Sequence, residues 1–556
     1  LFGTHKRKIK NQEKFRKYLL SSIVKYKNTT KIINEVYMAL IQKGINNLGD
    51  FVDSVFKKYS DTPAYSCLGQ SLSFKEIDEK SHALACYLQG EAGLKSGDRI
   101  VIQLPNLIQY PIAAYAAARA GLVIVNTNPL YTEREMAHQF TDSGAKAIII
   151  LSDLLPKLDA IKSDTDIQTV IVTGAADLLT GSTDVSNVNV GFTQAIAAGS
   201  GQTLTARTHT LSDISVLQYT GGTTGVSKGA ALSHSNVLSN ASQTLLHLGD
   251  KCGEGTEIFI SPLPLYHIYA FSVNMLMFFS KGNLNVLIPN PRDMDAFVNA
   301  LKPFKFTGFA GLNTLFVGLC MQPDFKTLDF SKFHLTLSGG TALTTGAADV
   351  WKQVTGCSIT EGYGLSETAP VLAFNTPGKE QIGTVGQPLS ETEIEMRDEN
   401  GKTLSQGEEG ELCARGPQVM TGYWKRPDET AKVMHSDGFF RTGDVGVILE
   451  NGNVKIVDRL KDMVIVSGFN VYPNEIEEVL TRHENILEAA VIGEPDDKTG
   501  EKVCAYLVVN KEIDSQAVIE HCKKDLTPYK VPKKIVFLDE LPKSTVGKIL
   551  RRELRK

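Results

Sequence analysis

The chain has 556 residues, of which 42% are hydrophobic and 22% charged, and its net charge is −4. These values are typical of globular proteins and exclude a disordered, collagen-like or coiled-coil chain. At about 100–200 residues per domain, the length predicts two to four domains. No apolar run reaches the ~18–20 residues that a membrane-spanning helix needs, because the most apolar stretch, residues 270–279, is interrupted by Ser272 and Asn274.

The charge is spread unevenly along the chain. Residues 1–31 contain ten Lys or Arg against the single acid Glu13, a charge of +9, so the remaining residues carry −13. An acidic body argues against nucleic acid as a partner, because phosphate binding requires a basic surface. The basic stretch lacks the apolar core of a secretory signal. We therefore expect residues 1–45 to be a poorly ordered leader, with weak contact to a membrane surface as the alternative.

The cysteines are scattered and form no C-x-x-C pair. They stand at Cys67, Cys86, Cys252, Cys320, Cys357, Cys413, Cys504 and Cys522. This pattern predicts free thiols in a reducing compartment, and neither a disulfide framework nor a zinc site. We expect a cytoplasmic protein.

The first part of the chain alternates short apolar runs with helical patterns. Strands are predicted at Arg99–Leu104, Ala147–Leu151 and Thr169–Val172, because these runs are short, continuously apolar and rich in β-branched residues. Between them, helices are predicted at Tyr110–Ala120 and Glu133–Ser143. This alternation indicates βαβ units and sheets covered on both faces.

Three later regions follow other patterns. Residues 175–210 are rich in Gly, Ser, Thr and Asn and are predicted to be a loop-rich insertion. From Gly383 onward, short strands alternate with turn sequences, which predicts a small β-rich subdomain. After Asp458 an α+β pattern returns, with helices predicted at Pro473–His483 and Ser515–Lys524 and strands at Ala489–Ile492 and Val503–Val509.

The strongest local motif is Tyr219-Thr-Gly-Gly-Thr-Thr-Gly-Val-Ser-Lys-Gly229, which follows the strand-like run Ile214–Leu217. Glycines allow backbone N–H groups to turn toward an anion, while the threonine hydroxyls and Lys228 add donors and positive charge. The motif therefore predicts a polyphosphate cradle. It is not a Walker A loop, which requires Gly-Lys-Ser/Thr, because here the lysine precedes the glycine.

The same stretch contains an alternative motif. Gly225-Val-Ser-Lys-Gly229 matches the G-x-S-x-G nucleophile elbow of serine hydrolases, with Ser227 as the nucleophile. An elbow places its serine at a sharp turn between a strand and a helix, whereas Ser227 follows a long polar glycine loop. The serine hydrolase is kept as a remote alternative.

Three further clusters carry ligand-binding chemistry. Leu337-Ser-Gly-Gly-Thr341 ends an apolar run with a glycine pair that suits close approach of a flat ligand. Thr360-Glu-Gly-Tyr-Gly-Leu-Ser-Glu-Thr368 combines an aromatic ring with hydroxyl and carboxylate oxygens, and Glu367 is a ligand type that suits Mg²⁺ bound with phosphates. In Arg441-Thr-Gly-Asp444, a carboxylate on a tight turn can accept hydrogen bonds from a ribose diol.

These motifs, in this order, resemble the adenylate-forming (AMP-binding) acyl-CoA synthetases across residues 48–556, with the closest similarity to the bacterial long-chain fatty-acid–CoA ligases. The segments that carry the resemblance are LPNLIQYP (104–111), VNTNPLYTERE (125–135), LQYTGGTTGVSKGA (217–230), LPLYHIYAF (263–271), EGYGLSETAP (361–370), GPQVMTGYW (416–424), VDRLKDMVIVSGFNVYPNEIE (457–477) and LPKSTVGKILRREL (541–554).

The resemblance implies an α/β fold. It consists of a large N-terminal domain of two α/β subdomains plus a small β-barrel, here residues 46–457, and a small mobile α+β C-terminal domain, here residues 458–556. It also implies two half-reactions: a carboxylate attacks the α-phosphate of ATP to give acyl-adenylate and pyrophosphate, and coenzyme A then displaces AMP. The implied partners are a fatty acid, ATP with Mg²⁺, and coenzyme A, with peripheral contact at the inner membrane and a homodimer as further expectations.

The resemblance also assigns roles to residues. Thr220, Gly221, Gly222, Thr223, Thr224, Gly225 and Lys228 would hold the ATP phosphates; Thr220 and Glu367 would bind Mg²⁺, with Ser366 on phosphate; Gly339, Gly340, Glu361, Gly362, Tyr363 and Gly364 would line the adenine site; and Asp444 and Arg459 would bind the ribose. Lys548 would bridge the carboxylate and the α-phosphate, Lys461 would be the domain hinge, Gly468 would lie beside the pantetheine tunnel, and His267 and Phe271 would lie next to the acyl pocket.

Two alternatives share this chemistry or this fold. The first is an adenylate-forming enzyme with another acid or acceptor, such as a medium-chain or aromatic CoA ligase or a luciferase-like oxygenase. The second is a non-enzymatic binding protein, which is disfavoured because the expected catalytic positions are filled. The apolar segment Leu263–Phe279 favours a long acyl tunnel, although core packing would give the same composition.

Overall fold

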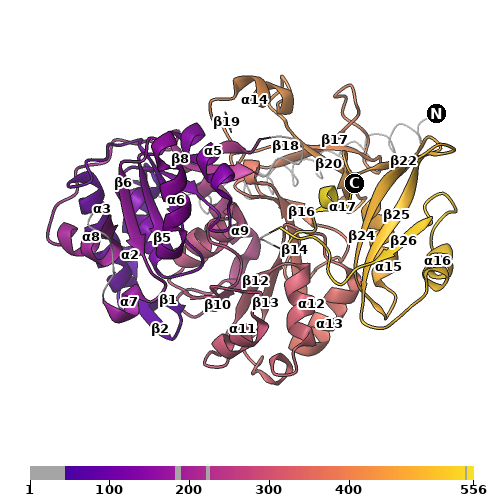
Figure 1. Ribbon diagram of the computed structural model, residues 1–556, viewed down its shortest axis with the longest axis horizontal. Helices are drawn as coiled ribbons and strands as arrows, with labels where there is room; N and C mark the ends of the chain where they lie inside the picture. Colours follow the sequence, from indigo (N-terminus) through magenta and orange to yellow (C-terminus); the bar gives the residue numbers. More distant parts are fainter. Residues whose placement is uncertain (1–43, 182–188, 221–225, 545–546, 556) are drawn as a thin grey trace, which may run out of the picture.

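The computed structural model describes residues 44–181, 189–220, 226–544 and 547–555 (Figure 1). Within these residues the strands form sheets of nine, eight, five and four strands. The two largest sheets build the N-terminal part, and the C-terminal unit lies apart at the right of the view, in yellow. Residues 1–43 of the expected basic leader lie outside the described part of the chain.

The eight-stranded sheet has the order β19-β9-β8-β4-β3-β5-β6-β7 and is parallel from β8 to β7. Its strands are β3 (Arg99–Gln103), β4 (Val123–Asn126), β5 (Ala147–Leu151), β6 (Thr169–Thr173), β7 (Val190–Gly191), β8 (Ile214–Thr220), β9 (Lys228–Ser233) and β19 (Gly422–Tyr423). The three strands predicted from apolar runs are confirmed to within one residue.

Helices cover both faces of this sheet, as the continuously apolar strands predict. Ile100 belongs to the buried cluster that includes α3 (Phe74–Gln89) and α4 (Gln109–Arg119). Its neighbour Val101 belongs to the cluster on the opposite face, with α5 (Glu133–Ser143) and α6 (Leu155–Ile161). Successive side chains of a strand point to opposite faces, so both faces of the sheet need cover. The two predicted helices are confirmed.

The nine-stranded sheet has the order β16-β15-β14-β13-β12-β10-β11-β1-β2 and packs on the first sheet through a shared core. Its strands are β1 (Pro63–Cys67), β2 (Gln70–Ser73), β10 (Ile258–Ser261), β11 (Leu284–Leu287), β12 (Gly308–Gly311), β13 (Leu335–Ser338), β14 (Ile359–Gly364), β15 (Val371–Phe374) and β16 (Gln387–Pro388). The π-helix η4 (Phe271–Phe278) is fully buried in the shared core.

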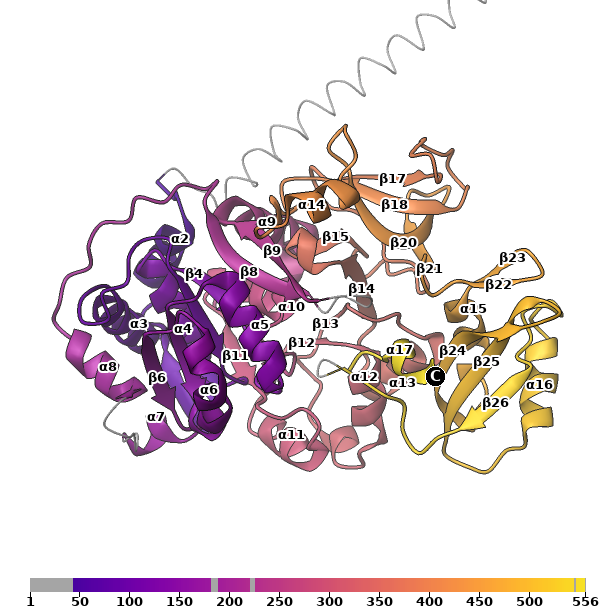
Figure 2. The same cartoon turned by 45° about the horizontal axis from the view of Figure 1, so that its top comes forward.

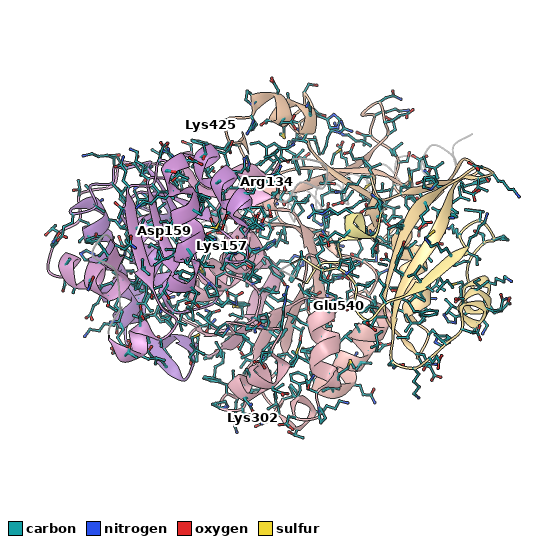
Figure 3. All side chains as sticks on the ribbon, in the orientation of Figure 1. Arg134, Lys157, Asp159, Lys302, Lys425 and Glu540 are labelled. Atoms are coloured by element: carbon teal, nitrogen blue, oxygen red, sulfur yellow. The ribbon has the colours of Figure 1, made fainter. Side chains whose placement is uncertain are left out.

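Further helices complete these layers. The helices α2 (Leu48–Lys58), α9 (His234–Leu248) and α10 (Ile268–Ala270) join the shared core, whereas α11 (Met294–Leu301), α12 (Asn313–Met321) and α13 (Thr345–Thr355) cover the outer face of the nine-stranded sheet around Trp351. The charged side chains of Arg134, Lys302 and Glu540 are exposed (Figure 3). Among the described residues, no helix is both long and apolar enough to cross a membrane.

The prediction of a loop-rich insertion at residues 175–210 is wrong in part. This region contains α7 (Asp177–Thr180), the edge strand β7 and the helix α8 (Phe192–Gly199). Phe192 and Ala195 are buried, and a Cβ on Gly199 would lie 1.9 Å from the carbonyl oxygen of Ala83 in α3. The small residues that suggested a loop are therefore the ones that permit α8 to pack closely on α3.

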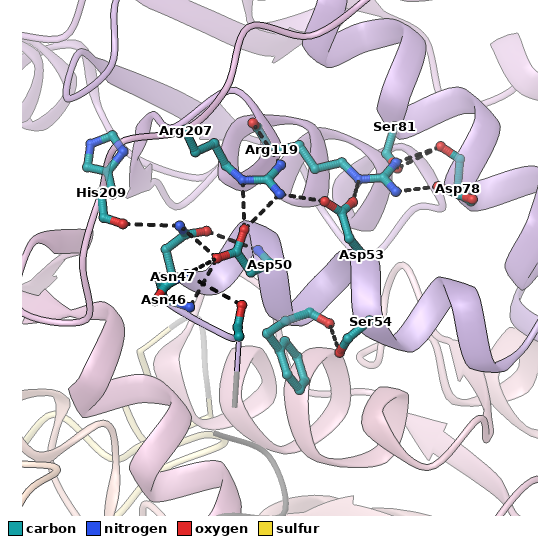
Figure 4. Close-up of polar contacts among 12 residues, drawn as sticks. Asn46, Asn47, Asp50, Asp53, Ser54, Asp78, Ser81, Arg119, Arg207 and His209 are labelled. Carbon is teal, nitrogen blue, oxygen red and sulfur yellow. Dashed lines mark hydrogen bonds and ion pairs between the residues drawn. The ribbon is translucent and has the colours of Figure 1, made fainter. Parts of the chain in front are cut away.

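The remaining loop of this region is fixed by two arginines (Figure 4). Arg207 binds Asp50 at 2.9 Å and Asp53 at 2.5 Å, both on α2. Arg119 of α4 is 3% exposed and binds Asp53 at 2.8 Å and also Asp78 of α3. A buried guanidinium requires several acceptors, and these acids supply them, so the cluster joins three helices and the loop.

The β-rich subdomain expected as a small barrel is a four-stranded antiparallel sheet. It consists of β17 (Glu393–Arg397), β18 (Gly410–Arg415), β20 (Phe440–Ile448) and β21 (Val454–Arg459), in that order, with α14 (Pro427–Val433) between β19 and β20. The proposed domain boundary at residues 457/458 falls inside β21.

The C-terminal unit is α+β, as its sequence pattern predicts. It contains β22 (Val464–Val466), β23 (Phe469–Val471), α15 (Pro473–Thr481), β24 (Ile486–Asp496), β25 (Gly500–Val509), α16 (Ser515–Lys523), β26 (Lys534–Phe537) and α17 (Arg551–Leu554). All eight cysteines of the chain are buried and free, which confirms that no two of them form a disulfide.

Candidate functional site

A cavity of about 1810 Å³ lies where the C-terminal unit meets the larger part of the chain. In Figure 2 the ribbons of β14, β21 and α17 converge on this region. Most of the residues predicted to form the site line the cavity: Thr220, Lys228, His267, Gly339, Gly340, Glu361, Gly362, Tyr363, Gly364, Ser366, Glu367, Asp444, Arg459, Lys461 and Lys548. Residues far apart in sequence are therefore brought together.

Five of the predicted residues are not described by the structure, and two lie elsewhere. Gly221, Gly222, Thr223, Thr224 and Gly225 lie outside the described residues. Phe271 is 1% exposed, belongs to the shared core and does not line the cavity. Gly468 is in the turn between β22 and β23, also away from the cavity. The apolar segment 263–279 is divided: Leu263, Ile268 and Val273 line the cavity, whereas residues 275–279 are core.

The glycines of the site have two different roles. Gly340 has φ +82° and open space around its Cα, so it leaves room beside the end of β13. In contrast, a Cβ on Gly362 would lie 2.3 Å from the Phe374 ring, and one on Gly364 would lie 1.8 Å from the carbonyl oxygen of Pro370. Glycine is therefore required at 362 and 364 by packing within the protein, independently of any ligand.

Tyr363, Asp444 and Arg459 form one hydrogen-bonded group. The Tyr363 hydroxyl donates to Asp444 Oδ2 at 2.6 Å, and Arg459 Nε lies 3.5 Å from Asp444 Oδ1. Asp444 and Arg459 are register partners on β20 and β21, which fixes their spacing. Burial, with the Asp444 charge, raises the pKa of Tyr363, so its hydroxyl stays a donor. The group holds a charged carboxylate at the cavity wall, where it can accept hydrogen bonds from a diol.

Glu367 is buried and has one donor on its side chain. The Tyr423 hydroxyl donates to Glu367 Oε1 at 2.8 Å, and burial raises the pKa of Glu367. A buried carboxylate is stabilised by a cation. Among the described residues no three His, Cys, Asp or Glu are arranged to hold a metal, so an ion at Glu367 needs further oxygens. The site fits Mg²⁺, which typically takes one or two carboxylates together with phosphates and water.

Lys228 begins β9 directly after the glycine-rich segment, but it already has a partner. Its Nζ lies 2.5 Å from Glu429 Oε2 of α14 and 4.9 Å from the centre of the Tyr423 ring. The pairs with Lys228 and Lys432 lower the pKa of Glu429 to about 2, so this carboxylate is charged. Glu429 was not predicted from the sequence, because it lies 201 residues from Lys228.

Lys548 lies among positive groups. Burial and the nearby Arg459 lower its pKa to about 7, against the opposing effect of Asp444. Burial and then Lys548 lower the pKa of His267 to about 4, so His267 is neutral at pH 7. Desolvation, followed by the nearby Arg459, lowers the pKa of Lys461, which also lines the cavity, to about 8. Lys548, Lys461 and Arg459 thus form a local group of cationic side chains in a cavity that acids also line, and such a group suits an anionic ligand.

Two contacts dock the C-terminal unit in the orientation that places Lys548 here. The Thr345 hydroxyl of α13 donates to Glu478 Oε1 of α15 at 2.8 Å. Gly547 has φ +78° and lies against Thr314 of α12, since a Cβ on it would be 3.0 Å from the Thr314 hydroxyl. In this orientation Lys548 reaches the cavity and Gly468 does not.

A buried cluster around Arg551 also was not predicted. Arg551 pairs with Glu477 at 2.7 Å, donates to Asn474 at 2.6 Å and lies 3.4 Å from both Asp458 and Asp462. These contacts join α17, which follows Lys548, to the segment around Lys461. The residues of this cluster belong to two motifs found in the sequence, at residues 457–477 and 541–554. The sequence did not indicate that the two motifs contact each other.

The serine hydrolase alternative is wrong. Ser227 lies just before β9, and β9 pairs antiparallel with β8, so the connection is strand to strand rather than the strand-to-helix turn of an elbow. The Ser227 hydroxyl donates to the backbone carbonyl of Thr220 at 2.7 Å. His138 contacts Ser227 only at its backbone carbonyl, at 2.8 Å.

Comparisons with known proteins agree with this geometry. The profile of the AMP-binding enzyme family matches residues 52–424, and that of the AMP-binding enzyme C-terminal domain matches residues 475–548. A long-chain-fatty-acid–CoA ligase from Salmonella typhimurium is 43% identical over 529 residues, 92% of this chain and 94% of that protein. The enzyme of that name from Bacillus subtilis is 37% identical over 523 residues, 89% of this chain and 92% of its own. The structure of ATP-bound MatB from Rhodopseudomonas palustris superimposes with a TM-score of 0.82 at 30% identity, covering 92% of this chain and 98% of that one.

Proposed function

Because the chain belongs to the AMP-binding enzyme family, we propose that it ligates a long-chain fatty acid to coenzyme A, with acyl-adenylate as the intermediate and AMP and pyrophosphate as products. The observation that carries the proposal is the position of Lys548 in the cavity lined by Asp444, Arg459 and Glu367. The names of relatives up to 43% identical over nearly the whole chain support the substrate class.

In the first half-reaction, the nucleotide would bind along the cavity wall. Gly340 leaves room beside the end of β13 for the adenine, and Asp444, held by Tyr363 at 2.6 Å, would accept hydrogen bonds from the ribose. Lys228 and Thr220 would bind the phosphates. These groups are fixed by strand pairing before any ligand arrives, which reduces the entropy lost on binding.

Glu367 and Thr220 would hold Mg²⁺ together with the phosphates. When bound, the ion would neutralise phosphate charge. The chain's own contribution is to orient Glu367 through the Tyr423 hydroxyl at 2.8 Å, a hydrogen bond that opposes the effect of burial on the pKa of Glu367.

Lys548 would place a positive charge between the two reacting anions. A fatty-acid carboxylate and the α-phosphate repel each other, so a cation between them lowers the barrier to their approach. With no ligand, the pKa of Lys548 is about 7 because of burial and Arg459. Two bound anions would raise it, so the lysine would be charged when it is needed. No protein base is required, because the carboxylate attacks in its ionised form.

In the second half-reaction, Lys548 would have to leave so that coenzyme A can reach the adenylate. We infer that the C-terminal unit turns about Lys461, which withdraws Lys548 and brings Gly468 to the cavity. Two observations support this step. Gly468 does not line the cavity in the present orientation. Lys461 lies in a turn, in which the Asp462 N–H donates to the Arg459 carbonyl at 3.0 Å. Peripheral contact with the inner membrane through residues 1–31 and a homodimer are further proposals, and residues 1–31 lie outside the described part of the chain.

A panel of acids tests the proposal. Acid-dependent exchange of labelled pyrophosphate into ATP, measured for acetate, octanoate, palmitate, benzoate and coumarate, should be fastest with palmitate and absent without acid. Fastest exchange with an aromatic or medium-chain acid would instead support the alternative adenylate-forming ligases. Absence of exchange with every acid would contradict adenylation itself.

A further inference from the structure

Lys228 is held by a carboxylate that the proposed chemistry does not use. The Lys228–Glu429 pair is 2.5 Å long, and both side chains are about one-third exposed, at 30% and 32%. Lys228 lines the cavity, and the pair is partly exposed, so an anion that enters can reach Lys228. A single ammonium group cannot serve a glutamate and a polyphosphate equally well, so the two anions compete for it.

The position of Glu429 is set by the framework and not by Lys228. Strand β19 pairs with β9 through Tyr423 and Ala230, and the Trp424 N–H donates to the Gly229 carbonyl at 2.8 Å. The Tyr423 N–H donates to the Thr430 hydroxyl at 2.9 Å, which fixes the start of α14. Loss of the Glu429 charge therefore leaves these contacts intact.

A second anchor holds the same segment to α5. Arg426 binds Asp142 at 2.8 Å, and Lys425 Nζ donates to the Asp142 carbonyl at 3.1 Å. Lys425 is labelled in Figure 3, on the turn that leads into α14. Glu429 is thus presented to Lys228 from a helix that is fixed on two sides.

We propose that Glu429 is an internal competitor of the polyphosphate: it occupies Lys228 when the site is empty, must be displaced when ATP binds, and recaptures Lys228 as pyrophosphate leaves. This inference rests on the proposed function, because it takes Lys228 as a phosphate ligand. The apparent affinity for a ligand falls by the fraction of molecules whose binding group is available. Glu429 therefore weakens ATP binding and favours product release.

The expected size follows from the exposure of the pair. Partly exposed ion pairs change an equilibrium constant by about 1.5- to 5-fold. Glu429→Gln should therefore tighten binding of Mg²⁺-ATP and of Mg²⁺-pyrophosphate by that factor, and pyrophosphate should become a stronger product inhibitor. AMP lacks the β- and γ-phosphates, so its dissociation constant should not change.

Asp428→Asn is the matched control. Asp428 is the exposed neighbour of Glu429 on α14, so this substitution removes the same charge at nearly the same place. Isothermal titration calorimetry of the full chain with Mg²⁺-ATP, Mg²⁺-pyrophosphate and AMP, without fatty acid, should show a change for Glu429→Gln and less than about a 1.5-fold change for Asp428→Asn. The Glu429→Gln effect should vanish in a Lys228→Met background, and thermal melts should show that each variant folds.

Four results would overturn the inference. Weaker ATP binding by Glu429→Gln would make Glu429 a group that positions Lys228. An equal gain in Asp428→Asn would make the effect one of general charge, and a gain that persists in Lys228→Met would show that the competition is not for Lys228. Wild-type chain that binds neither ATP nor pyrophosphate would contradict the proposed function itself, and the inference with it.

Discussion

The Tyr423 hydroxyl donates to Glu367 Oε1 at 2.8 Å, and these two residues come from β19 and from the turn after β14. Tyr423 therefore orients the carboxylate that is proposed to bind Mg²⁺. The same tyrosine ring lies 4.9 Å from Lys228 Nζ. One side chain thus links the groups that are proposed to meet the metal ion and the polyphosphate.

Glu367→Gln keeps the size of the side chain and removes the charge that Mg²⁺ requires. Activity should fall, and the Mg²⁺ concentration for half-maximal pyrophosphate exchange should rise at least tenfold. Tyr423→Phe, which removes only the donor and leaves the carboxylate in place, should give a smaller rise. Unchanged Mg²⁺ dependence in Glu367→Gln would exclude Glu367 as a ligand.

The pKa of Lys548 predicts a pH dependence for the free enzyme. A lysine is charged below its pKa, so the required cation is lost as the pH rises through about 7. The kcat/KM for the first half-reaction should therefore decline above about pH 7, because this quantity reports on the free enzyme. The kcat should decline only at higher pH, since the bound anions raise the pKa. Lys548→Arg, which stays charged, should abolish the decline in kcat/KM; the same decline in that variant would assign it to another group.

The apolar side chains on the cavity wall predict a dependence on chain length. Leu263, Ile268 and Val273 line the cavity, and each buried CH₂ contributes about 0.8 kcal/mol, close to fourfold in kcat/KM. Specificity should therefore rise steeply with each carbon until the cavity is full. Val273→Phe should move the optimum to a shorter acid. A flat profile, or an unmoved optimum in this variant, would argue against an acyl site here.

Lys461→Pro tests the proposed hinge. Proline fixes φ near −65° and restricts the preceding residue, so it should trap one orientation of the C-terminal unit. One half-reaction should continue while the other slows at least tenfold, measured as pyrophosphate exchange and as thioester formation from supplied acyl-AMP. Lys461→Ala is the control for loss of the side chain. If the ratio of the two rates equals that of the wild type, the hinge is not at this residue.

The sequence predicted the strands and helices of the N-terminal part well, because buried parallel strands such as Ala147–Leu151 have a composition that loops do not share. The helix α8 was missed, since the small residues that let it pack on α3 are also typical of loops. At Gly362 and Gly364 the sequence suggested a ligand, whereas the structure shows close packing on Phe374 and Pro370. A glycine motif indicates a close approach but not the identity of the neighbour.

The polar part of the site was predicted from motifs, and its connections were not. Asp444 and Arg459 were proposed from short segments, and their register pairing gives the physical reason for their proximity. The contacts of Lys228 with Glu429 and of Arg551 with Glu477 depend on tertiary pairing between segments far apart in the chain. Such pairing has no local signal in one sequence.

The central claim is that Lys548 serves the formation of acyl-adenylate and not its consumption. The most direct test measures both half-reactions of Lys548→Ala: pyrophosphate exchange with palmitate, and thioester formation from supplied palmitoyl-AMP and coenzyme A. Removal of one such charge should slow the first by about 10²–10³-fold and leave the second within about threefold of wild type. Equal loss in both half-reactions, or an unchanged rate of exchange, would contradict the claim.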